Sequence, residues 1–215
     1  MENSEQRILE AAESEFLQKG YDGAKTTAIA RRAGVTHAML HYYFGSKERL
    51  YGQVLETKIR ELGHSLLEAF TQPGRSLAER VSLGIGRHFD FLAAHPELPR
   101  FVLNEATRQG TSRELILRMI GRRVERVVAA MQQEADRLAA GRRPICCRRL
   151  LLDMVSLNFF TVSACPLLSR LYGMDESSFL AMRRQEIIET ALHRIAQPEN
   201  GPAGGLPQSL TLSTP

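Results

Sequence analysis

The strongest constraint on the fold is a helical periodicity that runs through the chain with few interruptions. Apolar residues recur three or four positions apart, as in Ile8, Ala12 and Phe16, and no stretch alternates apolar and polar residues for long enough to make a sheet. Glycine and proline divide this pattern into segments. The sequence therefore predicts an all-α fold.

The ends of the segments carry recognisable capping and stop residues. The first helix breaks at Gly20, and Thr26 or Thr27 can cap a short second helix that stops at Gly34. A third helix, capped by Thr36, ends near Phe44, and a long fourth helix capped by Ser46 extends to "TQPGRS" (71–76). Further helices are expected at 77–94, 97–109, 113–140, 145–171 and 175–196, the last capped by Asp175. Residues 197–215 are rich in Pro, Gly and Ser and predict a disordered tail.

Composition narrows the class of protein. The net charge is +4, and arginine supplies 24 of the 28 basic residues, which suits contact with phosphate or carboxylate groups. No signal peptide is evident, and the apolar run 150–171 contains Asp153, Asn158 and Pro166, so we expect a buried helix rather than a membrane span. The three cysteines predict reduced thiols in a cytoplasmic protein, without the spacing of a zinc or redox site.

Residues 26–44 have the pattern of a helix-turn-helix. Apolar positions allow two short helices to cross steeply: Ile29, Ala30, Ala33, Val35, Leu40 and Phe44. The second helix then presents His37, Ala38, His41 and Tyr42 on its other face, with Tyr43 close by, where polar and flat side chains can reach bases or phosphates. Thr27 lies at a helix N-terminus, which favours an anion, and Lys47 follows at the start of the fourth helix.

Two other interpretations of this segment are less favoured. Tyr42, Tyr43 and Phe44 are consecutive, so they cannot all face one core, which argues against purely structural packing. His37 and His41 could form a metal pair, but no glutamate lies between them as in HExxH and no third ligand is evident. We therefore interpret the segment as a surface that reads DNA.

The stretch "ILEAAESEFLQKGYDGAKTTAIARRAGVTHAMLHYYFGSKERLYGQVL" (8–55) resembles the DNA-binding domain of the TetR family of transcriptional regulators. The resemblance implies that Thr27, Thr36, Tyr42 and Lys47 contact phosphates, and that His37, Ala38 and Tyr43 lie nearest the bases. Family members usually have tyrosine where this chain has His41. A protonated imidazole would bind phosphate better than a neutral one, so operator affinity is expected to depend on pH.

Beyond residue 70 the resemblance is architectural only. It implies three regions: a helix-turn-helix domain (1–50), a helical ligand-binding and dimerisation domain (51–196), and the tail (197–215). The segments 150–171 and 175–196, the latter with Phe179, Met182, Ile187, Ala191, Leu192 and Ile195, are expected to pair across a twofold axis in a homodimer, although they could instead complete the monomer core.

The larger domain offers candidates for a small-molecule site. Phenylalanines could line an apolar cavity: Phe89, Phe91, Phe101, Phe159 and Phe160. Polar anchors could come from His64, His88, Asn104 and Asn158. Residues 100–149 hold twelve arginines against five acidic residues. This run could bind an anionic effector or DNA, although a solvated helix face is the favoured interpretation.

Together these features predict a cytoplasmic, homodimeric, ligand-responsive repressor without cofactor or metal. It would release a palindromic double-stranded DNA operator when a small-molecule effector binds. A ligand-insensitive architectural DNA binder is the alternative, and a helical enzyme is less favoured because no catalytic constellation is apparent.

Overall fold

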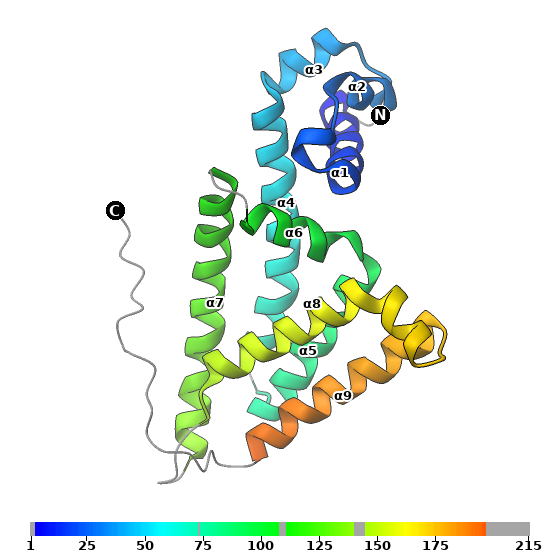
Figure 1. Cartoon of the computed structure of the whole chain (residues 1–215). Coiled ribbons are helices and arrows are strands. Elements are labelled where there is room, and N and C mark those ends of the chain that lie inside the picture. The colour runs from blue at the N-terminus through cyan, green and yellow to red at the C-terminus, as the bar shows by residue number, and fades with distance from the viewer. Residues whose placement is uncertain (1–2, 73, 108–110, 140–144, 197–215) are drawn as a thin grey trace.

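The computed structural model describes residues 3–72, 74–107, 111–139 and 145–196, and these residues fold entirely into helices and their connections (Figure 1). The helices are α1 (Ser4–Gly23), α2 (Thr26–Ala33), α3 (His37–Phe44), α4 (Lys47–Thr71), α5 (Leu77–Ala94), α6 (Glu97–Thr107), α7 (Thr111–Leu138), α8 (Cys147–Leu171) and α9 (Glu176–Ala196). The predicted all-α class is confirmed. The predicted tail lies outside the described residues.

Local capping chemistry fixes the N-termini of several helices. The hydroxyls of Thr36 and Ser46 accept hydrogen bonds from the backbone N–H three residues later, at 3.2 Å each. Asp175 likewise accepts from Ser178 N–H at 2.9 Å. The capping prediction for α2 was wrong, because Lys25 occupies the N-cap position and no side chain caps the helix. Thr26 and Thr27 are instead the first residues of α2.

Helices α1–α3 form a compact unit at one end of the molecule, and α4 leads from it into a larger helical body (Figure 1). The apolar positions predicted for the crossing helices are buried, apart from the half-buried Val35. Gly34 turns the chain between α2 and α3 with φ 65° and ψ 35°, a left-handed conformation that favours glycine. The predicted domain boundary falls in the first turn of α4, which continues unbroken, and the division itself stays a prediction.

The larger body is built from α4 to α9. Helix α4 packs on α5 and α7, while α5 also packs on α8 and α9. Helix α8 is, by length and composition, the one helix among the described residues that could cross a membrane, and 39% of its apolar window is buried. Its buried positions include Leu150, Met154 and Val162, so one face of α8 belongs to the protein core.

Two sets of contacts join the small unit to α4 and the body. The Tyr51 ring of α4 makes edge-on contacts with Phe16 of α1 (centroids 4.8 Å apart) and with Phe101 of α6 (5.9 Å). The buried Lys58 ammonium lies 2.6 Å from Glu13 of α1 and 2.9 Å from Glu61. Burial alone would lower the pKa of Lys58, but these two carboxylates raise it. Helix α4 is therefore held to α1 by both aromatic packing and a charged bridge.

Candidate DNA-binding surface and effector pocket

The first candidate site is the outer face of α3. Leu40 and Phe44 point into the core, so the intervening positions are left on the surface. Ala38 is exposed, and the Tyr42 side chain is 83% exposed. The Tyr42 ring packs edge-on against the Tyr43 ring, with centroids 5.5 Å apart. Such a face, on the second helix of a helix-turn-helix, has the geometry to enter a major groove.

The two histidines of α3 form an ordered pair. Their rings meet edge-on with centroids 4.5 Å apart. His37 Nε2 lies 2.9 Å from the hydroxyl oxygen of Thr26, and His41 Nδ1 lies 2.9 Å from the carbonyl oxygen of Gly45. A carbonyl oxygen only accepts, so His41 Nδ1 carries the proton. In the neutral ring Nε2 therefore lacks a proton, and only the imidazolium form can donate to a phosphate from that atom.

Lys47 is positioned at the beginning of α4. Its ammonium group lies 4.7 Å from the centre of the Tyr21 ring, a cation–π contact that orients the side chain. The Tyr21 hydroxyl donates to the Glu48 carboxylate, and this bond is the main reason that the pKa of Glu48 falls to about 2. Thr27 is exposed on the first turn of α2. The predicted DNA-contact residues thus lie on α2, α3 and the first turn of α4.

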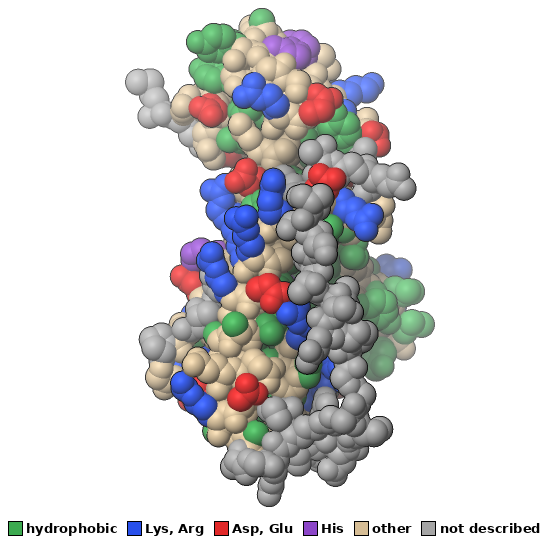
Figure 2. Space-filling view, turned by 90° about the vertical axis from the view of Figure 1, so that its left-hand side faces the viewer, with side chains coloured by type: hydrophobic (Ala, Val, Ile, Leu, Met, Phe, Trp, Pro, Cys, Tyr) green, Lys and Arg blue, Asp and Glu red, His purple; other side chains and the backbone are tan. Residues whose placement is uncertain are grey.

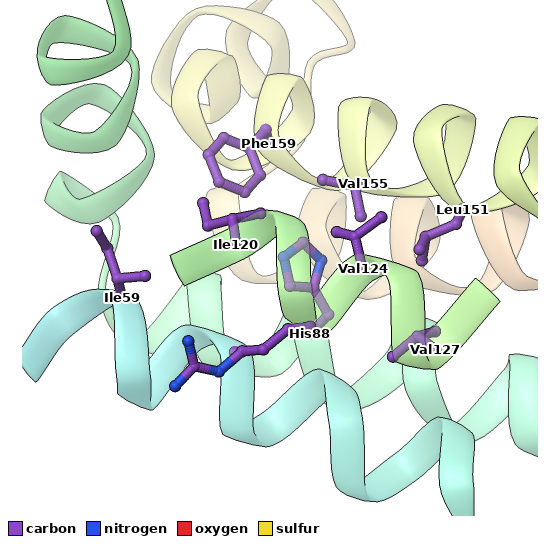
Figure 3. Close-up of a pocket in the computed structure, with 10 residues that line it drawn as sticks. Ile59, His88, Ile120, Val124, Val127, Leu151, Val155 and Phe159 are labelled. Atoms are coloured by element: carbon purple, nitrogen blue, oxygen red, sulfur yellow. The ribbon is translucent and has the colours of Figure 1, made fainter. Parts of the chain in front are cut away.

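The second candidate site is an apolar pocket in the larger body (Figure 3). Its walls come from α4, α7 and α8, through Ile59, Ile120, Val124, Val127, Leu151, Val155 and Phe159. His88 of α5 contributes the one imidazole of the lining, and its ring stacks on Phe159 with centroids 5.7 Å apart. A pocket with this lining suits a largely apolar small molecule or the apolar part of a larger one.

The protonation of His88 follows from its neighbour Asn158. The Asn158 amide nitrogen donates to the carbonyl oxygen of Ile85 at 3.2 Å and lies 2.9 Å from His88 Nδ1. Since that nitrogen is a donor, His88 Nδ1 accepts and Nε2 carries the ring proton. Nε2 is buried without a hydrogen-bond partner among the described residues. Burial lowers the pKa of His88 to about 4, so the ring is neutral at pH 7 and offers one N–H donor.

The other predicted ligand anchors lie elsewhere. Phe101 is buried against Tyr51, and Asn104 is exposed on α6, so neither lines the pocket. His64 is exposed and lines a neighbouring groove between α4 and α7 rather than the pocket. Phe160, also considered for the cavity, is 62% exposed. Sequence reasoning missed the valines of α7 and α8, although Val124 and Val127 lie on the apolar stripe of α7 that the periodicity reveals.

The described residues contain no group of three or more His, Cys, Asp or Glu side chains that could hold a metal ion. The three cysteines are free. Burial raises the pKa of Cys147 to about 12 and also raises that of Cys165, so neither thiol is ionised at neutral pH.

Comparisons with known proteins agree with this geometry. The family model described as "Bacterial regulatory proteins, tetR family" matches residues 8–54. The HTH-type transcriptional repressor SCO4008 of Streptomyces coelicolor is 34% identical over 111 residues, which cover 52% of this chain and 54% of that protein. The repressor NicS of Pseudomonas putida is 27% identical over 78% of this chain and 80% of its own length. The chain spans little more than half the length of two curated relatives above 30% identity (57% and 54%).

Solved structures extend the likeness to the whole fold. The transcriptional regulator FadR from Bacillus subtilis, in complex with stearoyl-CoA, superposes with a TM-score of 0.67 at 18% identity. The alignment covers 86% of this chain and 96% of that one. At this identity the likeness concerns the fold alone.

Proposed function

We propose that this chain is a ligand-responsive transcriptional repressor of the TetR family of bacterial regulatory proteins, and that it binds DNA as a homodimer in the cytoplasm. The observation that carries this proposal is the exposed face of α3, held by a buried helix-turn-helix core and flanked by Lys47. Thr27, Thr36, Tyr42 and Lys47 would contact phosphates. His37, Ala38 and Tyr43 would lie nearest the bases, with His41 beside them.

A twofold-symmetric operator requires two such units, and α8 supplies a surface for pairing. Four large apolar side chains between 62% and 72% exposed would be unusual on one helix of a monomer. Large exposed apolar residues of α8 recur at positions that share one helical face: Leu152 (65%), Phe160 (62%), Leu167 (63%) and Leu171 (72%). On α9, by contrast, Phe179, Ile187 and Ala191 are buried within the chain. In the proposed dimer α8 therefore carries most of the apolar contact.

The proposed effector site is the apolar pocket, because it adjoins the helix that bears the DNA-binding unit. Ile59 of α4 lines the pocket, and Tyr51 and Lys58 of the same helix contact α1. An effector that binds better to one position of α4 shifts the population toward that position. The separation of the two recognition helices would then no longer match the operator.

The experiment that tests this function is selection of bound sequences from a random duplex pool at near-physiological salt. A twofold-symmetric motif is the expected result. An unstructured, salt-sensitive pool would favour an architectural DNA binder, and absence of binding would refute the DNA-binding role.

The selected operator then allows a test of Lys47. Replacing Lys47 with alanine should weaken binding across sequences and reduce the slope of log affinity against log salt by about 0.9 for each lost phosphate contact, hence by about 1.8 for a dimer. Lys19→Ala is the matched control, since Lys19 lies on α1 in an ion pair with Glu15. An unchanged slope in the Lys47 variant would remove this residue from the interface.

A further inference from the structure

A strongly basic groove lies beside the apolar pocket and shares a residue with it. The groove lies between α4 and α7 and is lined by Arg60, His64, Arg118, Met119, Arg122, Arg123 and Arg126. Figure 2 shows Lys and Arg side chains gathered along the middle of this side of the molecule. Arg123 lines both spaces.

The charge of the groove is largely uncompensated. Among the lining groups, the Arg60 guanidinium lies 3.5 Å from Glu56, and His64 Nδ1 lies 3.7 Å from Glu68. Arg118, Arg122 and Arg126 follow one another at intervals of four residues on α7, so they line one face of the helix, and the described residues provide no carboxylate partner for them. A row of like charges on one helix face is destabilising without a counter-charge. The groove is therefore suited to an anion of more than one charge.

Arg123 stands at the junction of the two spaces. Its guanidinium donates to the Met119 carbonyl at 2.9 Å, and its side chain lies directly over the backbone of Gly63. A Cβ atom at position 63 would come within 2.3 Å of the Arg123 Cδ atom, so only glycine leaves room for this placement. Gly63 also lines the pocket. The junction thus holds one guanidinium between an apolar cavity and a cationic groove.

We propose that the pocket and the groove form one site for an amphiphilic effector, whose apolar chain fills the pocket and whose multiply charged, phosphate-bearing head lies on the arginines of the groove. A planar guanidinium can bind phosphate through two parallel hydrogen bonds, which is why arginine suits such a head. This inference deepens the proposed function, and it rests on that function for the consequence of binding. Binding itself is tested independently of DNA.

The test measures direct binding of palmitoyl-coenzyme A to the full chain by calorimetry, below its micelle concentration. Free coenzyme A and palmitate serve as the separate halves of the probe. The double variant Arg118→Gln/Arg122→Gln removes two charges from the groove. Arg113→Gln/Arg137→Gln is the matched control, because it removes two exposed arginines of the same helix that do not line the groove. Operator binding is measured on the same samples.

The expected result is that the joined probe binds at least tenfold more tightly than either half. The groove variant should weaken this binding about tenfold, as for two partly exposed ion pairs, while the control stays within twofold. Raising the salt concentration should weaken binding in the wild type more than in the groove variant.

Two results would overturn the inference. The first is binding of palmitate as tight as that of the joined probe in both wild type and groove variant, which would leave the head without a site. Alternatively, the groove variant could weaken operator binding alone, which would make the arginines a DNA contact. If the probe binds as expected but operator affinity does not change, the site stands and the proposed ligand-responsive function fails.

Discussion

The burial of His88 makes a sharp prediction about stability and pH. Above about pH 6.5 the imidazole is neutral in both the folded and the unfolded chain, so it has no effect on the pH dependence. As the pH falls below that value, the unfolded chain takes up a proton, whereas the folded chain does not until the pH approaches about 4. Stability is therefore lost over this window as the pH falls, and the loss is complete below it.

The magnitude follows from the size of the pKa shift. Lowering the pKa of His88 from 6.5 to about 4 costs about 3 kcal/mol of folding free energy once the pH is below both values. At pH 5 the cost is about 2 kcal/mol, because the unfolded chain is already protonated and the folded chain is mostly neutral. Protonation of the folded form would also place a proton on Nδ1, against the amide group of Asn158 that now donates to it.

The measurement is urea-induced unfolding at pH 7.5 and pH 5, at fixed protein concentration, of the wild type and His88→Gln. Between pH 7.5 and pH 5 the wild type should lose about 2 kcal/mol more unfolding free energy than His88→Gln, which lacks the buried imidazole. His193→Gln is the control for the loss of an imidazole, because His193 is exposed on α9. Parallel pH dependences for wild type and His88→Gln would refute the assignment of a neutral, buried imidazole.

Two further predictions concern packing and the DNA-binding face. In Gly84→Ala the new Cβ would lie 2.4 Å from the Phe70 ring, so unfolding experiments should show a destabilisation of about 1–3 kcal/mol. Gly121→Ala is the control and should not destabilise the protein, because no atom lies within 4 Å of the position of its Cβ. His41 Nδ1–H is bonded to the Gly45 carbonyl, so only the protonated ring can donate to phosphate, and operator affinity should be higher at pH 6 than at pH 8. Equal affinities at the two pH values, or the same pH dependence in His41→Gln, would contradict this role.

Local chemistry explains which parts of the fold could be predicted. Thr36, Ser46 and Asp175 cap helices through an oxygen and an N–H only three residues apart, so the sequence contains both partners. The α2 cap failed because Lys25 takes the N-cap position, although threonines follow it. Periodicity likewise identified Leu40 and Phe44 as core, and the opposite face of α3 as surface.

The pocket that we propose as the effector site could be predicted only in part, because it depends on packing between distant helices. Phe101 and Phe159 both lie on apolar stripes, yet one packs on Tyr51 and the other lines the pocket. His88 and Asn158 are seventy residues apart, and only the packing of α5 on α8 brings them into contact. Nor does an apolar segment such as 150–171 reveal which of its faces the monomer covers.

The placement of the pocket on α4 explains how a small shift could control DNA binding. Ile59, in the pocket wall, lies twelve residues from Lys47, which corresponds to roughly 18 Å along the helix axis. A tilt of about 5° around the pocket would move the start of α4 by roughly 1.5 Å over that length. Hydrogen bonds to bases tolerate only a few tenths of an ångström, and the two subunits of a dimer would move in opposite senses. Lys58 and Tyr51 tie α1 to α4 between these points, so the DNA-binding unit would move with the helix. A modest difference in effector affinity between the two tilts of α4 would therefore suffice to release the operator.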